Sequence, residues 1–346
     1  MTIHALIFDE SRALSAGLPE ARAAIGKARL VWIDAEGRSP EVEELLRALQ
    51  IHPLTIEDIF ETGTTPKVED FGHYLYVRAH GVAVPPEGPY HLRKEELDIV
   101  VGSGWVFTHH GAGTSACAEV REELRRLAPA VTGTSGATPE RGHSEVPVMM
   151  RVPGPAVDAP RVAHLLLDRL VDDAIPAMDA IDDAAEELEK ASVEPVPRRN
   201  MVAQVLALRS ALHRFRRTAV HQRETLLRLA RGEFAAIPKE QLPFFRDVYD
   251  HASRLADLAD EARDLLGGVL EAHLSMVSNR LNEVTKVLTM TATVFLPISF
   301  IASVYGMNFE YMPELHWRWG YPAVLAAMAL TAGGLLLWFR RRGWME

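Results

Sequence analysis

Two long apolar stretches near the C-terminus constrain this chain more than any other feature of its sequence. They cover about 288–304 and 321–339, and neither contains a charged residue. Because an α-helix rises about 1.5 Å per residue, each stretch can cross the roughly 30 Å hydrocarbon core of a bilayer. The sequence therefore predicts a hairpin of two membrane-spanning helices joined by the short segment 306–320.

The rest of the chain has the composition of a soluble protein. Of its 346 residues, 24% are charged, the net charge is −10, and this length can hold two domains. The acidic balance argues against nucleic acid as a partner, because phosphate binding needs a basic face, and it permits attraction of cations. Cys117 is the single cysteine, so an internal disulfide and a multi-cysteine zinc site are excluded. The N-terminal residues predict no cleaved signal peptide.

The charges that flank the two stretches predict their orientation. Two bases precede the first stretch and three arginines follow the second, whereas the connecting segment has one base and two acids (Arg280, Lys286, 340–342, Arg318, Glu310 and Glu314). The positive-inside rule places both termini in the cytoplasm and segment 306–320 outside, in the extracellular or periplasmic space. Residues 321–346 are then the second transmembrane helix and a basic cytosolic tail.

Residues 1–127 predict a mixed α/β domain in the cytosol. Four short segments rich in β-branched or aromatic residues predict strands at 30–34, 74–78, 97–101 and 105–108. A proline followed by acids predicts a helix over 40–50. Residues 128–160 are rich in Gly, Pro, Ser and Thr without periodicity, which predicts a flexible insertion.

Three long helices are predicted after the insertion. Apolar residues recur at three-to-four spacing over 162–188, opposite an acidic face, and at coiled-coil spacing over 201–229. These two helices form a predicted hairpin within 161–240. The third begins near Pro243 and meets no further proline until Pro297, so a continuous stalk and first membrane span are predicted over 241–305. Within this predicted helix, the one position expected to weaken helical structure before the membrane is the glycine pair at 267–268.

One face of the first membrane helix carries small, amide and hydroxyl residues broken by leucines. The stripe contains Asn282, Thr285, Leu288 or Thr289, Ala292, Leu296, Ser299 and Ser303. Such a stripe suits a helix that lines a pore between subunits, because a lone hairpin has no lumen. The alternative is that the hydroxyls bond to their own backbone or join helices. The stripe lacks Asp, Glu, His and Cys, so it suits a hydrated hard cation such as Mg²⁺, which sheds its waters reluctantly.

Two separated motifs give the chain a family resemblance. Gly306-Met307-Asn308 ends the first membrane helix, with Met312-Pro313-Glu314-Leu315 after it, and the N-terminal domain contains His52-Pro53-Leu54, Glu57-Asp58 and Pro66-Lys67-Val68-Glu69. This arrangement resembles the CorA family of magnesium and cobalt channels in the 2-TM-GxN superfamily. The resemblance implies a funnel-shaped homopentamer in the bacterial inner or plasma membrane, without an organic cofactor. It also implies passive transport of divalent cations, chiefly Mg²⁺ but also Co²⁺ or Ni²⁺, gated by intracellular Mg²⁺.

The resemblance also gives roles to individual residues. Gly306, Met307 and Asn308 would form the selectivity filter, where a ring of Asn308 side chains selects a hydrated ion by size and hydrogen bonding. Glu310 and Glu314 would raise the cation concentration outside. Leu288 and Leu296 are the candidate hydrophobic constrictions. In the family, a bulkier apolar residue often stands at the position of Thr285, so the lower gate here is expected either to be weaker or to rest on Leu288 alone. Asp247 and Asp168 match acids that hold regulatory Mg²⁺.

Three other classes of function compete with a magnesium channel. A membrane-anchored coiled-coil scaffold that moves no ions would share the helices, and a zinc transporter of the same superfamily would share Gly-Met-Asn. The intact motif at 312–315 favours the magnesium branch. An enzyme is not expected, because the glycines at 102–104 and 111–113 lack the spacing of a P-loop or dinucleotide fingerprint. His109-His110 shows no placed carboxylate and is typical of a strand end.

Overall fold

The computed structural model describes residues 2–9, 13–127, 157–192, 194, 200–308, 312 and 316–344. The chain divides into two compact units, of which the first is Met1–Ala191 with Arg198–Val269 and the second is Ser192–Pro197 with Leu270–Glu346. The boundary at Val269 falls inside helix α8 (Leu242–Tyr305), directly after the glycine pair at 267–268. Of the predicted insertion, residues 128–156 lie outside the described residues.

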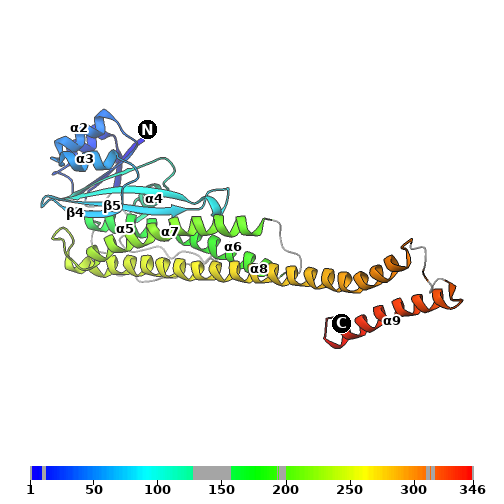
Figure 1. Cartoon of the computed structure of the whole chain (residues 1–346). Helices are drawn as coiled ribbons and strands as arrows, with labels where there is room; N and C mark the ends of the chain where they lie inside the picture. Colours follow the sequence, from blue (N-terminus) through cyan, green and yellow to red (C-terminus); the bar gives the residue numbers. More distant parts are fainter. Residues whose placement is uncertain are drawn as a thin grey trace, which may run out of the picture. The chain divides into compact units, whose positions relative to one another are not determined.

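In the described part of the first unit, seven strands form one mixed sheet (Figure 1). Their order is β2-β1-β3-β7-β6-β5-β4, in which β3 and β7 run parallel and the other neighbours antiparallel. The strands are β1 (Thr2–Phe8), β2 (Ala13–Ala16), β3 (Leu30–Glu36), β4 (Lys67–Asp70), β5 (Tyr74–Ala83), β6 (Arg93–Gly102) and β7 (Trp105–His110). The four predicted strands are confirmed as β3, β5, β6 and β7.

Helices α1 (Leu18–Ala24), α2 (Pro40–Ala48) and α3 (Pro53–Phe60) pack against one face of the sheet around a buried apolar core. Ser39 caps α2, because its hydroxyl accepts a hydrogen bond from the Val42 amide at 3.2 Å. The helix predicted over 40–50 is confirmed as α2, which ends two residues earlier, at Ala48. Gln50 adopts a left-handed φ of 58°, and the Ile51 amide donates back to the Leu46 carbonyl at 3.0 Å.

A buried ion pair ties the end of α3 to the sheet. Arg78 on β5 is 1% exposed, and its Nε lies 2.7 Å from Oδ1 of Asp98 on β6. The Tyr76 hydroxyl donates to the same carboxylate oxygen at 2.7 Å. The Arg78 guanidinium also donates to the carbonyl oxygens of Asp58 and Glu61. Because each polar group in the pair has a partner, the buried charge is tolerated.

The opposite face of the sheet is covered by helices that include α5 and α7 (Figure 1). The helices after β7 are α4 (Ala116–Leu127), α5 (Ala159–Asp172), α6 (Ile175–Ser192) and α7 (Met201–Ala230). The helix predicted over 201–229 is confirmed as α7, and most of its predicted apolar positions are buried. α7 is joined to β5 where the Gln222 side chain accepts a hydrogen bond from the His80 amide at 2.9 Å.

The prediction of one helix over 162–188 is wrong, because the structure has two. α5 ends at Asp172 and α6 begins at Ile175. Pro176 is the physical reason: it has no amide hydrogen, and in a continuous helix its ring would clash with the carbonyl of Asp172. The chain turns instead through Asp173 and Ala174, and the Ala174 amide donates to the Val171 carbonyl at 3.0 Å.

Helices α8 and α9 (Gly320–Arg341) are each long and apolar enough to cross a membrane. α8 is 64 residues long, begins after the short 3₁₀ helix Lys239–Gln241, and stays helical through Pro297, which confirms the predicted continuous third helix. A second 3₁₀ helix, Pro89–His91, connects β5 to β6. Large apolar side chains stay exposed on α8 and α9 in the single chain. Exposed surface of this kind needs lipid or further copies of the chain to cover it.

Candidate functional site

Within the second unit, one face of α8 is partly covered. The buried or half-buried positions are Lys286, Met290, Thr293, Val294, Pro297, Ile298, Ile301 and Val304, most of them three or four residues apart. The Lys286 ammonium donates to the carbonyl of Gly343, just beyond α9, at 3.5 Å. This is therefore the face of α8 that is turned toward α9.

The predicted pore stripe lies on the other side of α8. Asn282, Thr285, Leu288, Leu296, Ser299 and Ser303 are all exposed. With about 100° between successive residues, the direction of this stripe is roughly opposite to the covered face. Leu288 is 68% and Leu296 72% exposed, so the two leucines predicted to form constrictions are largely uncovered by the described part of the chain.

The hydroxyl of Thr285 also takes the alternative role named above. It donates a hydrogen bond to the Leu281 carbonyl one turn earlier at 2.8 Å, as the Thr291 hydroxyl does to Val287 at 2.9 Å. This bond uses the hydroxyl hydrogen and leaves the oxygen lone pairs free to accept. The two roles are compatible, because a hydrated cation presents water hydrogens to its surroundings.

The helix ends where Gly-Met-Asn begins. The Gly306 amide donates to the carbonyls of Ala302 at 2.9 Å and Ser303 at 3.1 Å, and α8 stops at Tyr305. A Cβ at Gly306 would lie 3.3 Å from the Ala302 carbonyl oxygen, so this close turn favours glycine. Met307 and Asn308 are exposed beyond it. Glu310 and Glu314 lie outside the described residues.

A second candidate site is an acidic cluster between α5 and α8 in the first unit. Asp168, Asp172 and His251 each offer one ligand atom, and these atoms lie within 4.8 Å of one another. Asp172 stands one turn after Asp168 on α5, and Nδ1 of His251 on α8 lies 3.5 Å from its Oδ1. We refer to Asp168, Asp172 and His251 as the α5–α8 cluster.

The charge of Asp247, the other predicted metal ligand, acts on this cluster. The pKa of Asp168 is raised to about 6, mainly because the carboxyl is buried and next because of the charge of Asp172. The charge of Asp247 on α8 raises the same pKa, whereas His251 and Arg161 lower it. The structure thus brings Asp168 and Asp247 into electrostatic contact although they are far apart in sequence. A bound cation would relieve the repulsion among these carboxylates.

Asp172 and His251 were missed from the sequence. Each stands four residues after a predicted ligand, Asp172 after Asp168 and His251 after Asp247, so helical spacing could have identified both. Carboxylate oxygens suit Mg²⁺, whereas an imidazole nitrogen suits Co²⁺, Ni²⁺ or Zn²⁺. The donor set therefore fits a divalent cation and includes one ligand that favours transition metals.

The prediction that His109-His110 lacks a placed carboxylate is wrong. Nδ1 of His109 lies 3.6 Å from the Asp98 carboxylate, and Nε2 of His110 lies 3.4 Å from that of Asp34. Strand pairing brings them together, because β7 lies between β6 and β3. Burial would raise the pKa of Asp34, but hydrogen bonds from His110 and Thr108 hold it below its usual value. Its second oxygen accepts from Arg121 at 2.9 Å, so this buried group is internally paired.

Comparison with known proteins gives three similarities. Residues 27–138 and 152–341 match the family model for the CorA-like Mg²⁺ transporter protein. The chain is 35% identical over 316 residues to the cobalt/magnesium transport protein CorA of Thermotoga maritima, covering 91% of this chain and 83% of that protein. It also superposes on the complete structure of the CorA magnesium transporter from Methanocaldococcus jannaschii. That TM-score is 0.80 at 21% identity, with 100% of this chain and 99% of that chain covered.

The same fold occurs in a differently named relative. The ZntB cytoplasmic domain from Vibrio parahaemolyticus aligns with a TM-score of 0.56 at 12% identity, covering 81% of this chain and 98% of that one. Identities this low to solved structures show the fold alone.

Proposed function

The chain belongs to the CorA-like Mg²⁺ transporter family, and from this premise we propose that it is a passive membrane channel for divalent cations, chiefly Mg²⁺. It is an integral membrane protein, with both termini in the cytoplasm. The observation that carries the proposal is the exposed amide and hydroxyl stripe of α8, which lies opposite the face turned toward α9 and leads to Asn308.

Conduction requires several copies of the chain. A helical hairpin satisfies its backbone internally and encloses no lumen, so a pore must form between subunits. In a homopentamer, α8 from each subunit lines the axis and α9 forms the outer ring in contact with lipid. The exposed leucines, Leu288 and Leu296, then make apolar rings that close the pore when water leaves them.

Selection takes place at the mouth of this pore. Mg²⁺ holds its water shell firmly, so a ring of Asn308 carboxamide oxygens can accept hydrogen bonds from the waters of the intact shell. Gly306 supports this geometry, because the close turn at the end of α8 leaves little room for a side chain. Glu310 and Glu314 add negative potential outside the filter and raise the local cation concentration.

Uptake into liposomes tests this function. The full chain is reconstituted with a Mg²⁺-sensitive dye inside, and wild type is compared with Asn308→Ala. Uptake should fall at least about tenfold without loss of the assembled oligomer. Thr331→Ala on α9 is the control, because its hydroxyl bonds only to its own helix and the change should leave uptake intact. Absence of uptake by the wild type would favour the membrane-anchored scaffold that moves no ions. Full uptake by Asn308→Ala would show that Asn308 does not form the selectivity filter.

The α5–α8 cluster and Asp247 supply regulation in this proposal. Intracellular Mg²⁺ binds these carboxylates where neighbouring subunits meet and favours the closed, symmetric pentamer, because only there do ligands from two subunits converge. Emptying the sites leaves like charges facing each other, which favours opening. The response is a population shift, limited by the difference in Mg²⁺ affinity between the two states.

Internal Mg²⁺ inhibition tests the regulatory site. Asp247→Asn should weaken inhibition and leave the ion preference unchanged, because Asn308 is intact. Asp179→Asn on the exposed face of α6 removes the same charge and should behave as wild type. Equal inhibition in all three proteins would make Asp247 an ordinary surface residue. A flux competition among Mg²⁺, Co²⁺, Ni²⁺ and Zn²⁺ separates this function from a zinc transporter, in which Zn²⁺ would compete best.

A further inference from the structure

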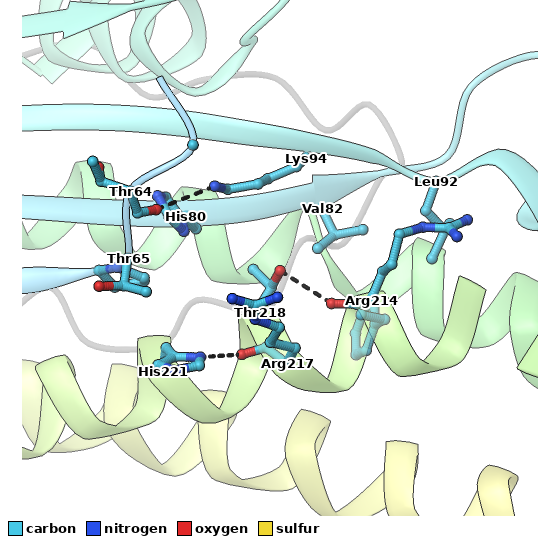
Figure 2. Close-up of a pocket in the computed structure, with 13 residues that line it drawn as sticks. Thr64, Thr65, His80, Val82, Leu92, Lys94, Arg214, Arg217, Thr218 and His221 are labelled. Carbon is cyan, nitrogen blue, oxygen red and sulfur yellow. Dashed lines mark hydrogen bonds between the residues drawn. The ribbon is translucent and has the colours of Figure 1, made fainter. Parts of the chain in front are cut away.

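A cavity of about 230 Å³ lies in the first unit between the sheet and helix α7. Its lining comes from the loop before β4, from β5 and β6, and from one face of α7. Figure 2 shows His80 and Lys94 on the strand side and Arg214, Arg217, Thr218 and His221 on the helix side. None of these residues belongs to the pore stripe or to the α5–α8 cluster.

The cavity is basic although the chain is acidic. Lys94, Arg214 and Arg217 bring permanent positive charges, and among the described lining residues there is no carboxylate, in a chain of net charge −10. Lys94 is compensated outside the cavity by Glu96 at 2.6 Å. The Arg214 guanidinium donates only to neutral oxygens, the Ser210 hydroxyl at 3.0 Å and the Tyr90 carbonyl at 3.3 Å. The two arginines therefore face the cavity without a countercharge in the described part of the chain.

A buried donor without a partner points to a ligand. His80 is 4% exposed, and its Nε2 has no hydrogen-bond partner among the described residues. The nearest carboxylate oxygen, on Glu96, lies 4.0 Å away, which is too far for a hydrogen bond. Burial and the charge of Lys94 lower the pKa of His80 to about 4, so the ring is neutral near pH 7 and can carry a proton on Nε2. Buried polar atoms are normally paired, so this one calls for an acceptor.

Helical spacing places four polar residues on one side of α7. Arg214, Arg217, Thr218 and His221 follow the i, i+3, i+4, i+7 pattern of a single helix face. The Thr218 hydroxyl donates to the Arg214 carbonyl at 3.2 Å and the His221 Nδ1 donates to the Arg217 carbonyl at 2.7 Å, so the two arginines supply the donors that remain on this face. Because adjacent guanidinium groups repel one another, an anion between α7 and the sheet would offset an unfavourable interaction.

We propose that this cavity binds a phosphoryl group, either as inorganic phosphate or as the terminal phosphate of a nucleotide. A tetrahedral dianion accepts more hydrogen bonds than a carboxylate, and the planar guanidinium fork matches phosphate oxygens in pairs. The volume is below the 300–1,000 Å³ range that is usual for a whole drug-sized ligand. A nucleotide would therefore insert its phosphates and leave the nucleoside outside.

Titration of the full chain in detergent tests the proposal. Inorganic phosphate and, separately, ATP are added in Mg²⁺-free buffer at constant ionic strength, with binding followed by calorimetry and by the unfolding temperature, which a ligand of the folded state raises. Arg217→Gln should weaken binding about tenfold, because it removes a charge-assisted contact. Arg209→Gln is the matched control: Arg209 is exposed on the same helix, carries the same charge and lies outside the cavity. His80→Leu should also weaken binding.

The outcomes separate the two sources and can overturn the proposal. Tighter binding of ATP than of inorganic phosphate, with competition between them, identifies a nucleotide, whereas tighter binding of inorganic phosphate identifies the free anion. Equal weakening by Arg217→Gln and Arg209→Gln would mean that only surface charge attracts the anion. If the wild type binds neither phosphate nor ATP saturably, the cavity is not a phosphoryl-binding site. Arg217 is exposed, so its substitution leaves the fold intact even if His80→Leu does not.

Discussion

Acidification should release divalent cations from the α5–α8 cluster. The pKa of Asp168 is raised from 3.8 to about 6, first by burial and then by the charge of Asp172. Between pH 3.8 and about pH 6, Asp168 binds a proton in the metal-free folded chain but not in the unfolded chain. Protonation of Asp168 therefore stabilises the metal-free fold as the pH falls through this range. A divalent cation needs the ionised carboxylate, so it competes with that proton.

The size of the effect follows from this pKa. One pH unit below it, only about one Asp168 carboxyl in eleven is ionised, so the apparent affinity for Mg²⁺ should be about tenfold weaker at pH 5 than at pH 8. Asp172→Asn removes a charge that raises this pKa, so the remaining pH dependence should move to lower pH. The assay is calorimetric titration of the full chain with MgCl₂ between about pH 5 and 8.

Two controls make the pH measurement decisive. Asp179→Asn alters an exposed carboxylate on α6 outside the cluster and should reproduce the wild-type curve. Asp168→Asn should bind weakly at every pH and lose the step near pH 6. A wild-type affinity that stays constant from about pH 8 to 5 would refute the argument. Persistence of the step in Asp168→Asn would assign it to another group.

Three further changes have definite expected results. His251→Ala should weaken inhibition by internal Co²⁺ or Ni²⁺ more than inhibition by Mg²⁺, because an imidazole favours transition metals; equal losses would remove His251 from the ligand set. Asp98→Ala should lower the free energy of unfolding by roughly 3–5 kcal/mol, because it leaves Arg78 charged and buried, whereas Glu44→Ala at an exposed pair should cost less than about 1 kcal/mol in denaturant unfolding. Gly306→Ala should reduce Mg²⁺ uptake several-fold with the oligomer intact, because the added methyl crowds the turn at the filter, and unchanged uptake would contradict this.

The strands that the sequence predicted are those whose side chains are mostly buried. β3, β5, β6 and β7 lie inside the sheet, and their β-branched and aromatic runs are recognisable locally. The missed edge strands, β2 and β4, have four residues each. Such strands are held by pairing with β1 and β5, an interaction that depends on context more than on their own composition. The break at Pro176 was present in the sequence, but the apolar periodicity continued through it.

The two sites differed in how far sequence could predict them. The predicted pore stripe lies on one continuous helix, so spacing alone placed its residues on one face, and Gly306-Met307-Asn308 follows directly after the end of that helix. The α5–α8 cluster joins helices distant in sequence, and no local pattern could say that His251 meets Asp172. The basic cavity needed more still. The spacing of Arg214 and Arg217 on α7 can be seen in the sequence. That the Nε2 of His80 lacks a partner becomes apparent only when β5 packs against α7.

The way α8 is held in the first unit suits regulation by weakly bound cations. Its buried face there is rich in alanine, including 252, 256, 259 and 262, which offer little interdigitation to lock the helix in one register. Its ion pairs, such as Arg216 with Asp260 at 2.6 Å, are exposed by more than a third, so solvent screens them and they hold the helix weakly. Moving a two-state equilibrium from 1:99 to 99:1 takes about 5.5 kcal/mol, or about 1.1 kcal/mol for each subunit of a pentamer. A roughly sixfold difference in Mg²⁺ affinity per subunit, between closed and open states, supplies that energy. A modest difference in affinity at the α5–α8 cluster is therefore sufficient for the gating proposed above.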